Sequence, residues 1–192
     1  MSKVVWKPGT MLYPAPAVLV SSHCRGEENV LTVSWAGTVC TEPAMLSISL
    51  RPERHSYRLI KESGEFVVNL PTAELARAVD FCGVKSGSRI DKFAAARLSR
   101  RPGRHVAAPL IAECPVCIEC RVKEVMPLGS HHLFLAEVLA VHAEESLIDS
   151  KGKFHLERAG LLCYNHGHYC SVTKPLGAFG FSVRKKRSKK DS

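Results

Sequence analysis

The chain has 192 residues, and 45% of them are hydrophobic, which suffices for one domain with a single buried core. No apolar run is long enough to span a bilayer, and the N-terminus lacks the apolar stretch of a signal peptide. We therefore expect a cytoplasmic protein without a membrane partner.

The formal net charge of +9 is concentrated near the C-terminus. Six Lys/Arg and one Asp in 184–192 contribute +5, so residues 1–183 carry only +4. No aromatic side chain interleaves with the charges of this tail, so nucleic-acid bases would find no stacking platform there. We expect one domain at 1–183 followed by a basic, disordered tail at 184–192, and we disfavour nucleic-acid binding.

Short strands separated by turns are expected in the first part of the chain. A loop at 23–28 and a turn segment at 36–43 interrupt them, since Pro43 cannot continue a central ladder. A short helix at 56–63 ends at Gly64. The expected strands are 18–22, 29–35, 44–50 and 65–70.

Two helical segments come next, at 72–78 and 91–98, with a loop rich in glycine and serine at 81–90 between them. Neither a Rossmann nor a P-loop glycine motif is present. Many short strands with few short helices favour a closed antiparallel barrel decorated by helices. The later strands are expected at 114–125 and 132–142, which form a hairpin, and at 161–164.

Eight cysteines invite a metal or disulfide interpretation. The run CPVCIEC, read as a strand, puts Cys114 and Cys120 on one face and Cys117 on the other, so the three thiolates cannot meet one metal ion. Cys163 and Cys170 are poor metal partners by spacing, and a cytoplasmic chain disfavours structural disulfides. We expect buried packing and no metal site, with a redox role for Cys117 as the weaker alternative.

Hydroxyl and basic side chains gather where two expected strands end. Ser47 and Ser49 share one face of their strand, and Arg51 and Arg54 follow directly. Ser56 then opens a helix, whose N-terminus offers free N–H groups. From these residues alone, a phosphate site and an ordinary set of surface charges both stay open.

The segments that carry these residues resemble the flavin reductase-like family, and within it the flavoredoxin branch. The matching pieces, in chain order, are NVLTVSWAGTVCTEPAMLSISLRPERHSY, GEFVVNLP, SGSRIDKF, GSHHLFLAEVLAV and LGAFGFSV. The resemblance implies a mainly β fold with short helices, namely an antiparallel FMN-binding split β-barrel of Greek-key type. It also implies a homodimer with the flavin near the subunit interface.

The resemblance further implies a set of FMN-binding residues. Contacts along the flavin are expected from Thr32, Val33, Ser34, Trp35 and Thr38. The ribityl phosphate is expected to meet Ser47, Ser49, Arg51, Arg54, Ser56 and Tyr57, with Lys92 reaching it or the pyrimidine side from a loop.

One histidine is expected to face the nicotinamide side of the flavin. The match points to His131, but His132 is its direct neighbour, and in a strand the two point to opposite faces. The cluster Tyr164, His166 and His168 lacks an evident third metal ligand, and we interpret it as a lid over the flavin or an interface contact.

The implied function is electron transfer through bound FMN. Electrons come either from NADH or NADPH, or from a redox protein, and the basic surface suits an acidic, ferredoxin-like partner. A non-enzymatic barrel module that binds nucleic acid or protein through its basic surface is the alternative from another class. A cysteine-based metal or redox protein is a third.

Overall fold

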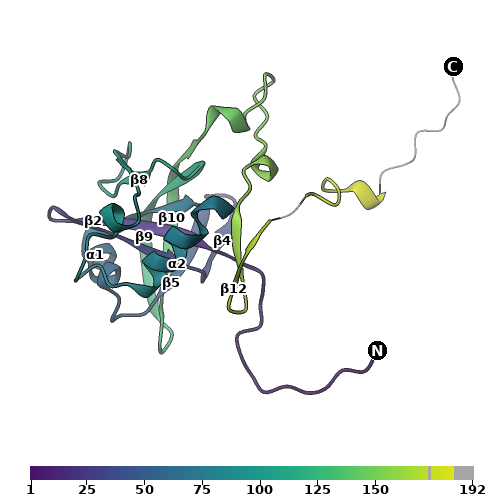
Figure 1. The fold of residues 1–192 in the computed structure, drawn as a ribbon, viewed down its shortest axis with the longest axis horizontal. Coiled ribbons are helices and arrows are strands. Elements are labelled where there is room, and N and C mark those ends of the chain that lie inside the picture. The colour runs from purple at the N-terminus through teal and green to yellow at the C-terminus, as the bar shows by residue number, and fades with distance from the viewer. Residues whose placement is uncertain (173, 184–192) are drawn as a thin grey trace, which may run out of the picture.

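The structure is a computed structural model that describes residues 1–172 and 174–183 (Figure 1). The basic segment 184–192, expected to be a disordered tail, lies outside the described residues. Among the described residues, no helix is both long and apolar enough to cross a membrane.

Seven antiparallel strands form the main sheet, and it curls into a barrel. Its two edge strands are consecutive in the chain and are joined only by Ser34 and Trp35, and the amide of Ser49 donates to the carbonyl of Trp35 at 2.8 Å. The expected antiparallel barrel is confirmed. In spatial order the strands are β3 (Glu27–Val33), β2 (Val18–Cys24), β6 (Glu65–Leu70), β9 (Val116–Pro127), β10 (His132–Ala143), β5 (Met45–Leu50) and β4 (Ala36–Cys40).

Two expectations about the first strands are wrong. The segment 23–28 is not a loop, because β2 and β3 continue through it and meet at a tight turn of Arg25 and Gly26, whose φ angles are 50° and 84°. The segment 36–43 is not only a turn, because it contains β4. Pro43 lies beyond β4, so it removes no bond from the ladder.

Three helices lie against the barrel. α1 (His55–Ser63) ends at Gly64, which adopts the left-handed conformation at φ 71°. α2 (Ala76–Val84) follows the short 3₁₀ helix η1 (Ala73–Leu75) and extends into the segment expected as a loop. α3 (Lys92–Ala95) is capped by Asp91, whose side chain accepts from the amide of Ala94 at 3.2 Å.

The core has two main parts, on the two faces of the sheet. Along β6, Phe66 and Val68 pack inside the barrel, whereas Val67 packs outside it with Val79 of α2 and Phe93 of α3. This alternation explains why the run 66–68 is apolar without a break, since both faces of the strand are buried.

The cysteines of CPVCIEC divide between these two parts. Cys120 packs inside the barrel and Cys117 outside it, as expected. Cys114 precedes β9 and packs with Cys117, so its expected place beside Cys120 is wrong. Burial raises the pKa of Cys117 to about 11, which leaves a thiol at neutral pH and disfavours a redox role. Among the described residues, no group of three or more His, Cys, Asp or Glu is arranged to hold a metal ion.

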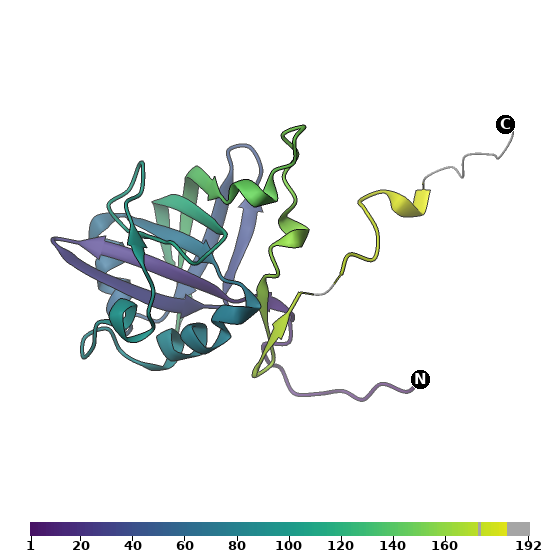
Figure 2. The same cartoon turned by 45° about the horizontal axis from the view of Figure 1, so that its top comes forward.

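A second, smaller sheet stands beside the barrel, where the N-terminal segment leaves it (Figures 1 and 2). It contains β1 (Ala15–Pro16), β11 (Leu162–Asn165) and β12 (His168–Ser171), of which β1 and β12 were not expected. The remaining short elements are β7 (Arg100–Arg101), β8 (Leu110–Ile111) and the 3₁₀ helices η2 (Glu145–Leu147), η3 (Leu156–Arg158) and η4 (Phe181–Val183).

Candidate functional site

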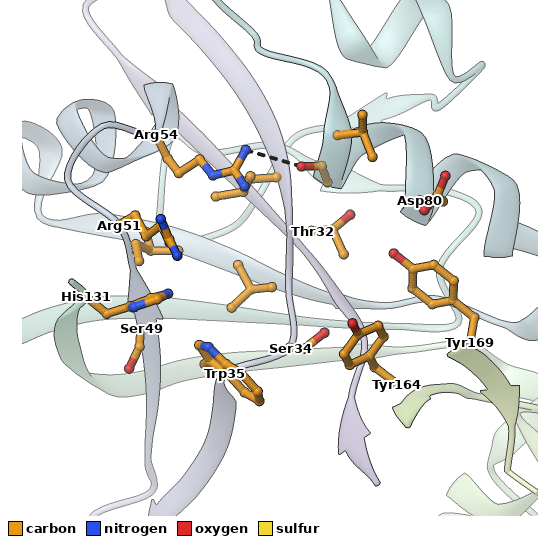
Figure 3. A pocket seen from close by; sticks show the side chains of 15 residues that line it. Thr32, Ser34, Trp35, Ser49, Arg51, Arg54, Asp80, His131, Tyr164 and Tyr169 are labelled. Carbon is orange, nitrogen blue, oxygen red and sulfur yellow. Dashed lines mark hydrogen bonds between the residues drawn. The ribbon is translucent and has the colours of Figure 1, made fainter. Parts of the chain in front are cut away.

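Two adjoining pockets open at the end of the barrel where β3 and β5 finish. Each has a volume of about 320 Å³, and they share Leu31, Arg51 and Arg54 in their walls. Together they form one continuous site of the size that small ligands and cofactors occupy, roughly 300–1,000 Å³. Figure 3 shows the first pocket, with Arg51 and Arg54 at one end and Tyr164 and Tyr169 at the other.

The second pocket is strongly cationic. Four Lys or Arg and one Glu line it, together with polar side chains and Gly87. The Glu53 carboxylate lies 3.4 Å from Arg51, whereas the Arg54 guanidinium donates to the neutral carbonyl of Gly83 at 3.3 Å (Figure 3). Positive charge is therefore in excess. The charged side chains are Arg51, Glu53, Arg54, Lys85 and Lys92.

The N-terminus of α1 opens into the same pocket. The helix begins at His55 after Arg54, and no side chain caps this end. Ser56, in the first turn, is buried, and its hydroxyl accepts from the side-chain amide of Asn29 at 2.8 Å. Free amides, the positive end of the helix dipole and adjacent guanidinium groups together favour an anion such as a phosphate.

Lys92 is more buried than the sequence indicated. It is the first residue of α3 and not part of a loop, and the residue is 2% exposed. Its ammonium group donates to the carbonyls of Val30 at 2.9 Å and Cys82 at 2.7 Å, which leaves one N–H for a ligand in the pocket that it lines. Burial lowers the pKa of Lys92 to about 8, so the group is still charged at neutral pH.

The first pocket collects most of the residues expected along the flavin. Thr32, on β3, donates its hydroxyl to the carbonyl of Val79 in α2, which ties the strand to the helix at the wall. Ser47 does not line the first pocket. It lines a third, larger cavity beside Trp35 and the N-terminal segment. The expected residues that line the first pocket are Thr32, Val33, Ser34, Trp35, Ser49, Arg51, Arg54 and His131.

The two adjacent histidines point to different sides. His131 lines the first pocket, its Nδ1 lies 2.9 Å from the hydroxyl of Ser130, and burial together with the charge of Arg51 lowers its pKa. His132 Nδ1 instead lies 2.8 Å from the hydroxyl of Tyr57. Of the two, His131 is therefore the one that a ligand in the pocket would meet.

Two expected residues lie away from these cavities. Tyr57 is 8% exposed and packs on Phe134 inside the barrel, which places it behind the wall of the site. Thr38 is exposed on the edge strand β4. Among the described residues, neither Tyr57 nor Thr38 lines the three pockets described above. The geometry therefore does not support a contact between these two residues and a phosphate or flavin.

The C-terminal hairpin supplies a wall that the sequence indicated only loosely. Tyr164 and Tyr169 line the first pocket, their ring centroids 5.6 Å apart, and Tyr13 packs 5.9 Å from Tyr164. Burial, and then the charge of nearby Asp80, raises the pKa of Tyr169. Tyr164 was expected in a lid or interface, but Tyr169 and Asp80 were missed. The paired tyrosines of CYNHGHYC were the available signal.

Two glycines permit a close approach of α2 and its following loop to β3. A Cβ atom at Gly83 would lie 3.3 Å from the Cβ of Thr32, and one at Gly87 would lie 2.1 Å from the side-chain oxygen of Asn29. Gly87 belongs to the SGS piece, so this part of the site was visible in the sequence as a glycine-rich loop. The close approach of Gly87 to Asn29 could not be predicted from the sequence, because the two residues are far apart in the chain.

Comparison with known proteins identifies the class. Residues 10–173 match the family model described as "Flavin reductase like domain", and the chain belongs to this family. A relative from Archaeoglobus fulgidus is 35% identical over 140 residues, which cover 73% of this chain and 78% of the relative.

Two solved structures place the chain more closely. The flavoredoxin of Desulfovibrio vulgaris (Miyazaki F) is 29% identical, with a TM-score of 0.88, and the match covers 95% of this chain and all of that one. An FMN-binding protein of Thermus thermophilus, solved with bound 1-cyclohex-2-enone, is 26% identical, with a TM-score of 0.78, over 93% of this chain and 99% of that one. The predicted resemblance to the flavoredoxin branch of a split-barrel flavin family is confirmed.

Proposed function

We propose that this protein is an FMN-dependent oxidoreductase that passes electrons through bound FMN. The observation that carries the proposal is the continuous site in which a cationic pocket adjoins a pocket walled by aromatic side chains. A phosphate joined to a planar ring system has the matching chemistry. The names of the similar proteins, a flavoredoxin and an FMN-binding protein, agree with this assignment.

The side chains present fit FMN at both ends. Arg51, Arg54 and the N-terminus of α1 would hold the phosphate, with the remaining N–H of Lys92 and the hydroxyl of Ser56 beside them. The segment 32–35, Ser49 and His131 would line the ring. When bound, FMN supplies hydride and single-electron transfer.

The protein's own contribution is binding and electrostatics. The excess of positive charge around Arg51, Arg54 and Lys92 stabilises negative charge that builds up at the site. Trp35 and Tyr164, which line the first pocket, would limit the access of water to a bound ring. The neutral imidazole of His131, favoured by its lowered pKa, is suited to a hydrogen bond at the open face.

The test is a visible absorption spectrum of the purified protein, followed by NADH and then NADPH without oxygen. Flavin bands that either nucleotide bleaches would identify a reductase. Bands that persist until dithionite or a reduced ferredoxin is added would identify a carrier between proteins. A protein that neither contains nor takes up FMN would overturn the proposal and favour a non-enzymatic barrel module.

A homodimer belongs to the same proposal. Beside Trp35 and His131 lies a cavity of about 890 Å³ whose outer wall is the N-terminal segment 9–16, where Leu12 is 93% exposed. A second copy would cover this apolar segment. Light scattering is expected to report twice the monomer mass, and Leu12→Asp is expected to lower it. A monomeric wild-type protein at micromolar concentration would contradict the dimer.

If the protein is a carrier, its partner is proposed to be an acidic, ferredoxin-like protein, because the chain carries a net charge of +9. Replacing the four lysines of 184–192 by glutamine should then slow partner reduction at low salt and leave it unchanged at high salt. Equal rates at low salt would remove the electrostatic partner model.

A further inference from the structure

The small sheet places two cysteines directly opposite each other. Cys163 on β11 pairs with Cys170 on β12, and both are free. The turn between the strands consists of His166 and Gly167, whose φ angles are 45° and 93°. Two positive φ angles are typical of the two-residue hairpin turn that holds one register, so the pairing of the cysteines is fixed by the turn.

The hydrogen-bond pattern sets the separation of the two cysteines. The amide of Val172 donates to the carbonyl of Leu161 at 2.9 Å, so this pair is a hydrogen-bonded one. Since such pairs alternate along an antiparallel ladder, Cys163 and Cys170 are hydrogen-bonded as well, with Cα atoms about 5.5 Å apart. Disulfides span Cα separations of roughly 4.4–6.8 Å, so the Cα separation of this pair lies within the range of a disulfide.

The thiols lie on the outer face of the small sheet. On β1, Pro16 pairs with Cys163 and is exposed, whereas Ala15 pairs with Tyr164 and is buried. Both cysteines are half-buried, in contrast to Cys114, Cys117 and Cys120, which are buried. Partial burial, and then the neighbouring Cys170, raises the pKa of Cys163, as expected for two sulfurs that face each other.

We propose that Cys163 and Cys170 are a redox modification site that forms a reversible intramolecular disulfide with a small-molecule disulfide as the oxidant. One protein thiolate attacks the small disulfide, which forms a mixed disulfide and releases one small thiol. The second protein thiolate attacks the protein sulfur of that mixed bond and releases the other small thiol. The dithiol loses two electrons and two protons, and the small disulfide is reduced to two thiols.

The bond would act on the candidate site through the strands themselves. Tyr164 and Tyr169 come directly after Cys163 and before Cys170, on the opposite face, where they line the first pocket. A disulfide between the neighbouring residue pair of the two strands limits the separation of the two tyrosines. Formation of the disulfide does not depend on FMN, so its test is independent of the proposed function.

The test incubates the native full-length protein with oxidised glutathione, blocks the remaining thiols, and maps the protein by mass spectrometry without reduction. We expect the intact protein to lose two hydrogen atoms. Chymotryptic cleavage after Tyr164 and Tyr169 would separate the two cysteines, so the fragments stay together only through the bond. Dithiothreitol is expected to restore both thiols.

Three variants control this result. Cys163→Ser and Cys170→Ser should each retain a mixed disulfide with glutathione at the remaining cysteine, because the second step is blocked. Cys40→Ser, at another partly exposed cysteine, should behave as the wild type. A wild-type protein that keeps stable glutathione adducts, stays unmodified, or pairs either cysteine elsewhere would overturn the proposal.

Discussion

The two ends of the candidate site are built differently. The cationic end rests on barrel strands and on α1, and its supports Ser56 and Lys92 are buried and hydrogen-bonded. The tyrosine end rests on β11 and β12, which stand beside the barrel. The comparison indicates that the end that would bind the cofactor is held by the core, whereas the end that would meet a substrate or partner belongs to a peripheral hairpin, which changes at less cost to the fold.

The largest expected effect comes from removing the two arginines of the cationic end. Arg51→Ala/Arg54→Ala is expected to weaken FMN binding by about 3 kcal/mol, roughly a hundredfold in Kd, because two charge-assisted contacts to the phosphate are lost. Fluorescence titration of FMN measures the change.

Arg58→Ala is the matched control for this pair. It lies on α1, a few residues after these two arginines, but its guanidinium is paired with Glu27 at the surface, away from the pockets. Its FMN affinity is expected to equal that of the wild type. If all three arginines affect binding equally, the effect comes from general surface charge and the cationic end is misassigned.

The next effect concerns a buried carboxylate on β9. Glu119 is fully buried, and its carboxylate accepts from the amides of Arg104, His105 and Val106 and from His142. These contacts outweigh burial, which alone would raise its pKa, and lower the pKa to about 2. We expect Glu119→Gln to cost about 3 kcal/mol at neutral pH, since the new amide N–H₂ faces backbone donors.

The sign of the pH dependence follows from the lowered pKa. The contribution of Glu119 is fully present above the unfolded value of about 4.5 and is lost as the pH falls towards 2. Urea unfolding across this range should show a fall in stability that is smaller in Glu119→Gln. Glu124→Gln, exposed on the same strand, should keep the wild-type profile. Identical profiles for both variants would contradict the buried role.

A smaller effect is expected from Lys92. Its pKa of about 8 predicts that FMN affinity falls above pH 8, by at most tenfold per pH unit, as the ammonium loses its proton. The unfolded chain keeps that proton up to about 10.5, so the free energy of unfolding should rise between these pH values. Lys92→Met should abolish both trends, whereas Lys85→Met, on the exposed rim, should keep them. If the FMN affinity of the wild type does not change with pH in this range, Lys92 does not contact the phosphate.

At the tyrosine end, turnover should change more than binding. Tyr164→Ala removes ring contacts to Tyr13 and Tyr169 worth about 1 kcal/mol, and we expect a change of roughly fivefold in the electron-transfer rate. The Kd for FMN should change less than about threefold. Tyr164→Phe keeps the ring and should match the wild type. A larger loss of FMN affinity than for Arg51→Ala/Arg54→Ala would reverse the comparison of the two ends.

The smallest effect is expected at Tyr57. Tyr57→Phe removes the hydrogen bond to His132 and should cost about 1 kcal/mol of stability without changing FMN affinity. Denaturant unfolding and flavin titration of the same sample measure both quantities. A tenfold loss of affinity would return Tyr57 to the phosphate site.

Local chemistry made some elements predictable. The strand 65–70 matches β6 residue for residue, because its apolar run is buried on both faces and Gly64 marks its start. The segment 36–43 was misread, because Gly37 and Pro43 are turn formers and an edge strand needs little local propensity. The antiparallel barrel was predicted from the many short strands, and the family from the order of its motifs; the structure and the comparisons confirm both.

The sequence by itself determined the class of the protein: the strand and glycine pattern, the basic and hydroxyl residues at the strand ends, and the resemblance that joins them. Tertiary structure decided which side chains meet. It turned His131 into the pocket and His132 to Tyr57, buried Lys92 against two carbonyls, and brought Tyr164 and Tyr169 across from the arginines. The reason is that burial, side-chain direction and contacts between distant segments depend on how sheets curl and pack, which no local pattern encodes.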